Sequence, residues 1–167
     1  ELFLKRCLVG GIDRVFEINR DFRNEGVDAT HAPEFTMVEA YQAYGNYDTI
    51  GALVKQLVQD TAMDVFGTHK VTLLDGSEYD FGGEWKTISM YDSLSEALGE
   101  EIVPNGGPDN PGTSVEHLGE IADKLGVERD DVENHGKLVE HLWEHFYEDK
   151  LYEPNFVRDF PVETSPL

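Results

Sequence analysis

The sequence holds one cysteine, Cys7, and few basic residues, with 13 Lys or Arg against 34 Asp or Glu and a formal net charge of −21. A single cysteine rules out an internal disulfide framework and is typical of a reducing cytoplasm. The negative charge argues against a broad phosphate-binding surface, so a nucleic-acid partner would need a local basic site or another domain. No apolar run approaches the roughly 20 residues of a membrane span, and no basic-plus-apolar leader opens the sequence. We therefore expect a cytoplasmic protein with no membrane contact.

The 167 residues nevertheless carry enough apolar side chains to fold. Hydrophobic residues make up 40% and aromatic residues 11% of the chain, which excludes wholesale disorder. The length suits one ordinary domain or a piece of a larger one. The chain starts at Glu1 with apolar residues at helical spacing but no preceding cap, and it stops at 165–167 directly after a strand-like run. We interpret it as a fragment of a longer protein.

Periodicity and turn residues predict an α+β protein with an antiparallel β-sheet flanked by helices. The expected helices cover an opening segment broken at Gly10-Gly11, then 48–67, 89–99, 113–125 and 131–149. The expected strands cover 14–22, 35–44, 71–74, 77–81 and 155–160.

Local signals mark several ends of these elements. Asp48 is an expected helix cap, Thr113 and Glu116 form an expected capping box, and Asp75-Gly76 is a hairpin signal. We expect a single partial domain with three segments. These are a strand–loop–strand with its following helix at 1–68, a hairpin and helical region at 69–153, and a returning strand at 154–167.

The strand expected at 35–44 has an unusual face. Alternate side chains of a strand share a face, so Phe35, Met37, Glu39 and Tyr41 point the same way. These types suit a pocket floor, where an aromatic ring stacks on a flat ligand and Glu39 receives a cation. An amphipathic strand with Glu39 at a solvated edge explains the same alternation.

The preceding loop, residues 23–34, carries side chains that suit a nucleotide. It has about 12 residues, and loops of that length inside compact domains are usually functional. Arg23 offers a planar fork that holds a phosphate or carboxylate by two bonds. His31 could reach a second phosphate, and Glu25 could accept hydrogen bonds from an amino group. A solvated turn explains each residue singly, but together with the strand face they indicate a nucleotide site.

The order of these residues resembles motif 2 of the class II aminoacyl-tRNA synthetases, and it is most similar to the lysine-specific enzymes. Asp-, Asn- and Lys-specific enzymes share the Pro-Glu-Phe element, and the pair Glu39 and Tyr41 favours lysine. Ala32 departs from the pattern, since many relatives have Asn there. The matching residues are Glu1-Leu2, Lys5-Arg6, Gly10-Gly11, 14–18, 22–26, His31, 33–36, Glu39, Tyr41 and 165–167.

The resemblance implies four residues that bind ATP. Arg23 would be the catalytic residue, bridging the α-phosphate and the carboxylate of the amino acid. Glu25 would contact the adenine amino group, His31 would touch the phosphates, and Phe35 would stack on adenine.

The resemblance also implies a lysine site. Glu39 and Tyr41 would read the ε-ammonium of lysine, and Glu1 would bind its α-amino group. Arg23 would hold the carboxylate of the same lysine. Selection of lysine needs acceptors in the pocket, because a desolvated ammonium without a partner is costly.

The implied activity is that of a lysine–tRNA ligase, which forms lysyl-adenylate from lysine and ATP and transfers lysine to tRNA(Lys). The patterns of motifs 1 and 3 do not occur, so we expect the isolated chain to be inactive. ATP is the implied substrate, with Mg²⁺ held mostly by ligands outside this chain. The resemblance further implies a homodimer, a partial catalytic core here, and a separate anticodon-binding domain that contacts tRNA.

Two other readings stay open. A related enzyme could attach lysine to an elongation factor or to a phospholipid. A regulatory relative could sense lysine or ATP without catalysis, although retention of both Arg23 and Glu39 argues against it. The flanking sequence would discriminate among these readings.

Several further signals favour structural roles. His141, Glu144 and His145 match a short zinc-protease pattern, but no third ligand is evident, and a half-exposed helix explains them better. We expect no metal site. The Gly-rich stretch 104–112 lacks the Lys and Ser/Thr of a phosphate loop and is expected on the surface. Three histidines are expected in solvent: His69, His117 and His135.

Overall fold

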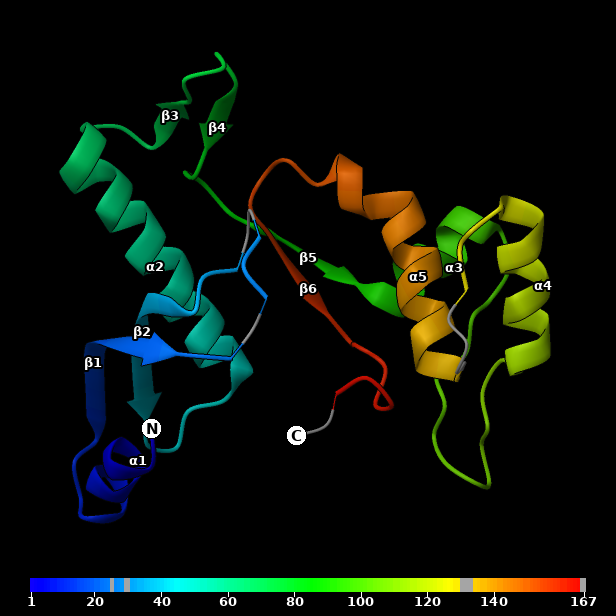
Figure 1. Ribbon diagram of the computed structural model, residues 1–167, viewed down its shortest axis with the longest axis horizontal. Coiled ribbons are helices and arrows are strands. Elements are labelled where there is room, and N and C mark those ends of the chain that lie inside the picture. Colours follow the sequence, from blue (N-terminus) through cyan, green and yellow to red (C-terminus); the bar gives the residue numbers. More distant parts are fainter. Residues whose placement is uncertain (25, 29–30, 130–133, 166–167) are drawn as a thin grey trace. The chain divides into compact units, whose positions relative to one another are not determined.

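The computed structural model describes residues 1–24, 26–28, 31–129 and 134–165. The chain divides into two compact units, Glu1–Leu53 (unit 1) and Val54–Leu167 (unit 2), and Figure 1 traces its elements in order. Helix α2 (Tyr47–Phe66) begins in unit 1 and ends in unit 2. Among the described helices, none combines the length and the apolar character that crossing a bilayer requires.

Unit 1 is built on a long β-hairpin preceded by a short helix. Helix α1 (Leu2–Val9) ends at Gly10, and Gly11 adopts a φ of +99°, which turns the chain sharply into the first strand. Strands β1 (Arg14–Phe22) and β2 (Glu34–Gln42) are antiparallel and pair along their whole length. The backbone N–H of Arg23 donates to the carbonyl of Pro33 at 2.9 Å, so the ladder extends into the mouth of the loop.

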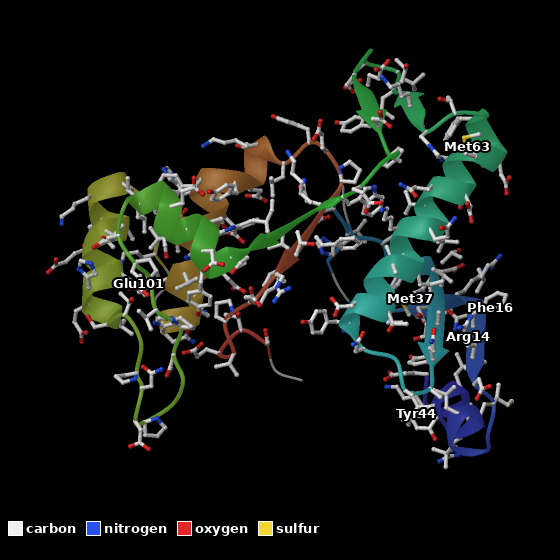
Figure 2. The ribbon with its side chains drawn as sticks, turned by 180° about the vertical axis from the view of Figure 1, so that it is seen from behind. Arg14, Phe16, Met37, Tyr44, Met63 and Glu101 are labelled. Atoms are coloured by element: carbon white, nitrogen blue, oxygen red, sulfur yellow. The ribbon has the colours of Figure 1, made fainter. Side chains whose placement is uncertain are left out.

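The two faces of this hairpin differ in burial. The β2 residues at 35, 37, 39 and 41 are half-buried, whereas those at 36, 38 and 40 are exposed. Phe16 and Met37 lie on opposite sides of the hairpin (Figure 2). The outer face carries four exposed apolar side chains: Phe16, Ile18, Phe22 and Val38.

Besides the second part of α2, the described residues of unit 2 form two small sheets and three further α-helices. Its antiparallel hairpin joins β3 (Lys70–Thr72) to β4 (Glu78–Asp80), and its parallel pair joins β5 (Lys86–Ser89) to β6 (Asn155–Arg158). The helices are α3 (Met90–Leu98), α4 (Val115–Leu125) and α5 (His135–Tyr147), followed by the 3₁₀ turn η1 (Glu148–Lys150).

The core of unit 2 lies between α3, α4 and α5, where their apolar faces meet. Polar side chains fix this packing, because the indole N–H of Trp143 and the hydroxyl of Tyr147 both donate to Ser93, each at 2.9 Å. The buried members of the core are Met90, Tyr91, Leu94, Ile102, Leu118, Ile121, Ala122, Leu138, Val139, Leu142 and Trp143.

The α+β class is confirmed, but five local predictions are wrong. Asp48 lies inside the first turn of α2 and does not cap it; Oδ1 of Asn46 accepts from the N–H of Thr49 at 2.9 Å at this helix start. The sheet is not wholly antiparallel, because β5 and β6 run parallel. Ser114, not Thr113, caps α4, while the Thr113 hydroxyl accepts from the N–H of Val103 at 2.8 Å. Helix α5 starts later than 131, since Asn134 is extended and caps it; residues 131–133 lie outside the described residues. His135 is buried, not solvated.

Candidate functional site

The half-buried face of the β1–β2 hairpin brings the predicted residues of β2 together. Alternation places Phe35, Met37, Glu39 and Tyr41 on this face, as the sequence predicted. The Glu39 side chain is only 14% exposed. It is therefore not a carboxylate at a solvated edge, and the pocket-floor interpretation fits the structure better.

Glu1, which precedes α1, and Lys5 of α1 lie at the Glu39–Tyr41 end of this face. The backbone nitrogen of Glu1 lies 3.4 Å from Oε2 of Glu39. Lys5, one turn later, donates from its ammonium to Oε1 of Glu1 and lies 5.4 Å from the ring centroid of Tyr41. Glu1, Glu39 and Tyr41, the three residues predicted to read the amines of lysine, thus gather at one place.

Burial and neighbouring charges shift the pKa values of three groups in this cluster. Burial raises the pKa of the Tyr41 phenol, and the negative charges of Glu39 and Glu1 raise it further. The hydrogen bond from Lys5 lowers the pKa of the Glu1 carboxyl and raises that of the Lys5 ammonium. At neutral pH the cluster therefore presents ionised Glu1, protonated Lys5 and a neutral phenol that can donate a hydrogen bond.

The two predicted phosphate-binding residues, Arg23 and His31, both lie in the loop between β1 and β2. The guanidinium carbon of Arg23 lies 5.4 Å from the ring centroid of Phe35, which keeps the two residues together. His31 is held by Asp28, whose carboxylate lies 3.0 Å from Nδ1 and accepts the backbone N–H of His31 at 2.8 Å. Glu25, predicted to contact adenine, lies outside the described residues.

Strand β1 contributes residues that sequence reasoning missed. The register pairs Glu17 with Glu39, Asn19 with Met37 and Asp21 with Phe35, so all three share the predicted face. Oδ1 of Asn19 and Oδ2 of Asp21 are buried without a hydrogen-bond partner among the described residues. The sequence could have indicated them, because strand 14–22 alternates in the same way as strand 35–44. Pairing of the two strands then places alternate residues of both on the same face.

The residue types on this face suit an extended ligand that is cationic at one end and anionic at the other. Glu1, Glu39 and Tyr41 offer acceptors and a ring to an ammonium, whereas Arg23 offers paired donors to a phosphate or carboxylate. Phe35 and Glu39 are four residues apart, which places them roughly 13 Å apart along the strand. That span suits an amino acid with a long cationic side chain joined to a nucleotide.

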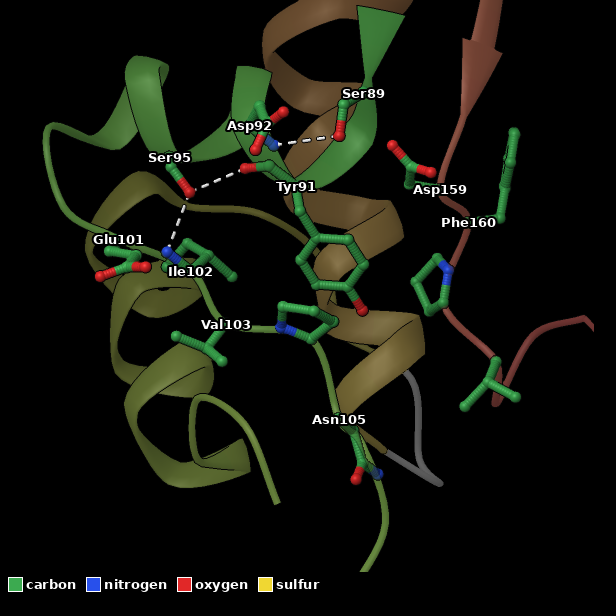
Figure 3. A pocket seen from close by; sticks show the side chains of 13 residues that line it. Ser89, Tyr91, Asp92, Ser95, Glu101, Ile102, Val103, Asn105, Asp159 and Phe160 are labelled. Atoms are coloured by element: carbon green, nitrogen blue, oxygen red, sulfur yellow. Dashed lines mark hydrogen bonds between the residues drawn. The ribbon is translucent and has the colours of Figure 1, made fainter. Parts of the chain in front are cut away.

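Two hollows in unit 2 are the other candidate sites, and neither contains the predicted ATP-binding or lysine-binding residues. A cavity of about 600 Å³ in unit 2 lies between α3, the segment 101–105 and the chain after β6 (Figure 3), but it contains none of the predicted site residues. His141, Glu144 and His145 line a second hollow, of about 500 Å³. Within the described ranges, no group of three or more His, Cys, Asp or Glu side chains is arranged to hold a metal ion.

The comparison with known protein families defines the class. The family model of class II tRNA synthetases specific for Asp, Lys and Asn (D, K and N) matches residues 1–167, and the chain belongs to this family.

Three curated relatives show which members of this family the chain resembles. The chain is 64% identical to a lysine–tRNA ligase of Kineococcus radiotolerans, 59% identical to one of Mycolicibacterium gilvum and 40% identical to one of Syntrophomonas wolfei. Each match covers 100% of this chain but 32% of the relative. The chain thus spans about a third of the length of these ligases.

Proposed function

We propose that the protein carrying this chain is a lysine–tRNA ligase, which activates lysine with ATP and transfers it to tRNA(Lys). The chain would form part of its class II catalytic core. The observation that carries the proposal is the gathering of Glu1, Glu39 and Tyr41 on one face, in a segment that aligns along its whole length with such ligases.

Activation needs positioning more than acid–base chemistry. A carboxylate oxygen of lysine attacks the α-phosphorus of ATP, the bond to the bridging oxygen breaks, and pyrophosphate leaves. The lysine carboxylate is already ionised, so no general base is required. The site must bring two anions together and stabilise the added charge of the transition state. We assign this role to Arg23, with His31 on the other phosphates.

Selection of lysine rests on the opposite end of the face. Glu39 would pair with the ε-ammonium, Tyr41 would add a hydrogen bond, and Glu1 would bind the α-amino group. Phe35 would stack on adenine and Glu25 would contact its amino group. A substrate without the ammonium would leave Glu39 desolvated and unpaired, which is a large penalty.

The remaining components follow from the family. Mg²⁺ would accompany ATP, and its ligands would lie mostly in parts of the ligase outside this chain. A homodimer, cytoplasmic location and tRNA contact through another domain complete the proposal. The named relatives are all lysine–tRNA ligases, which favours this function over modification of an elongation factor or phospholipid, or over a sensing module.

Substitution of Glu39 in the full-length protein tests the proposal. Glu39→Gln keeps the shape and removes the charge, so lysine affinity should fall by about 2–5 kcal/mol, the range for breaking a desolvated charge pair. ATP affinity should change little. Isothermal titration of each ligand measures both.

The matched control is Glu34→Gln. Glu34 lies on the same strand but on the outer face, where it is half-exposed and pairs with Arg20 at 3.4 Å. This change should alter lysine affinity by under about 1 kcal/mol. Equal lysine affinity of the Glu39→Gln and wild-type proteins would remove Glu39 from the lysine site.

A further inference from the structure

Lys5 lies inside the cluster that the proposed function assigns to lysine, although it was not predicted as a site residue. It stands one helical turn after Glu1, a spacing that places the two side chains on one side of α1. Its ammonium donates to Oε1 of Glu1 and lies 5.4 Å from the centroid of the Tyr41 ring. One cation therefore contacts two of the three residues proposed to bind lysine.

Lys5 offsets negative charge at this end of the hairpin. The backbone nitrogen of Glu1 lies 3.4 Å from Oε2 of Glu39, and Glu17 is directly opposite Glu39 in the register, so three acidic residues belong to this end of the hairpin. Like charges on facing positions repel each other. Lys5 supplies a positive charge that offsets this repulsion.

Lys5 also restrains the largely exposed side chain of Glu1. The Glu1 side chain is 59% exposed, and a side chain of that length loses rotamer entropy when a ligand orders it. Lys5 occupies Oε1, whereas Oε2 of Glu1 accepts no hydrogen bond from any described residue. The carboxylate is thus held with one oxygen available to a ligand.

We propose that Lys5 is a positioning residue of the lysine site, which orients the Glu1 carboxylate and the Tyr41 ring before substrate lysine arrives. This inference rests on the proposed function. Lys5 does not contact the substrate in this scheme. It pre-orients the groups that do, and pre-orientation of a site increases affinity because less ordering remains to be done on binding.

The test is a set of variants of the full-length protein, measured by the Kd and KM of lysine, the Kd of ATP and kcat. Lys5→Met removes the ammonium but keeps the stem. The affinity for lysine should fall roughly tenfold, with kcat and ATP affinity within about twofold of wild type. Lys5→Arg keeps the charge and the ring contact, so it should recover most of the lost affinity.

Arg6→Met is the matched control. Arg6 is the next residue of α1 and lies 5.5 Å from the ring of Phe3, so its loss removes an equal charge and a similar ring contact away from the cluster. Lysine affinity should stay at the wild-type value. Lys5→Gln serves as a second neutral variant if Lys5→Met does not fold.

Four results would overturn the assignment. Unchanged lysine affinity in Lys5→Met would mean that Lys5 does not position the site, and tighter binding would identify its ammonium as a competitor of the substrate. An equal loss of ATP affinity would indicate general structural damage. If Lys5→Arg did not recover the affinity for lysine, the positive charge at this position would not be what positions the site. The wild-type protein tests the proposed function separately. If it binds lysine, the proposed function stands whatever the Lys5 variants show; if it does not, the proposed function is contradicted.

Discussion

A buried hydrogen-bond chain between α3 and α5 gives the most direct test of the packing in unit 2. The Tyr91 hydroxyl lies 3.2 Å from Nε2 of His135, and Nδ1 of His135 lies 2.9 Å from the carbonyl oxygen of Thr113. A carbonyl only accepts, so we assign the imidazole proton to Nδ1. Nε2 of the neutral ring then accepts from Tyr91.

The change Tyr91→Phe removes the donor and leaves the ring in place. Tyr91 is 7% exposed and His135 is 3% exposed, so water does not replace the lost partner. A buried acceptor left unpaired costs roughly 1–3 kcal/mol, and no cavity term is added because only one oxygen is removed. Unit 2 should therefore lose about 2 kcal/mol of stability.

The assay is native-state hydrogen exchange on the full-length protein, which reports the opening free energy of the amides in α3 and α5 separately from the rest of the chain. The control is Tyr152→Phe, because Tyr152 is 68% exposed and its hydroxyl can bond to water. Equal changes in the protection of α5 in the two variants would contradict the loss of a buried hydrogen bond in Tyr91→Phe.

The same contact predicts a response to alkaline pH. Burial, with smaller contributions from the charges of Glu163 and Glu140, raises the pKa of Tyr91 from its ordinary value of 10.0 to about 12. The unfolded chain loses this proton first as pH rises. The contribution of Tyr91 to stability is thus complete below pH 10.0 and is lost between pH 10.0 and about 12. Tyr91→Phe should abolish this part of the pH dependence.

Two further predictions concern the nucleotide end of the site and the backbone of unit 2. Arg23→Lys in the full-length protein should slow lysine-dependent ATP–pyrophosphate exchange by roughly 100-fold, because a point charge does not replace the planar fork. Near-normal exchange would mean that two parallel hydrogen bonds from Arg23 are not needed. Arg20→Lys on the exposed face is the control. Gly112→Ala should cost more than about 2 kcal/mol in denaturant unfolding, since φ is +72° and the added Cβ would lie 2.5 Å from the Val103 carbonyl oxygen. Gly126→Ala, with φ +71° and open space around it, should show only the backbone cost of about 1 kcal/mol, and equal effects would exclude the clash.

Local pattern was sufficient for the hairpin of unit 1. Alternation predicted strand 14–22 with the bounds that the structure has, and it predicted the face that Phe35, Glu39 and Tyr41 share. The reason is physical: side-chain direction on a strand is set by residue parity alone. The roles of these residues in binding remain predictions.

Long-range partners explain what the sequence did not predict. Thr113 and Ser114 are both good helix caps, and the choice was decided by the N–H of Val103, which takes the Thr113 hydroxyl. His135 is buried because Tyr91, 44 residues earlier, supplies a hydrogen bond. The place of Lys5 depends on how α1 packs beside β2, and no periodicity within either element contains that information.

The strict register of the hairpin limits which sequence changes the protein can tolerate. Strands β1 and β2 pair along their whole length, so the side chains of the two strands that share a face are fixed by this register. A single deletion inside β2 would alter this set, because a shift of one residue exchanges the two faces of a strand. It would turn Val38 or Ala40 inward and Glu39 outward. Natural variants and engineered libraries of this segment should therefore keep the interval from Phe35 to Tyr41 constant.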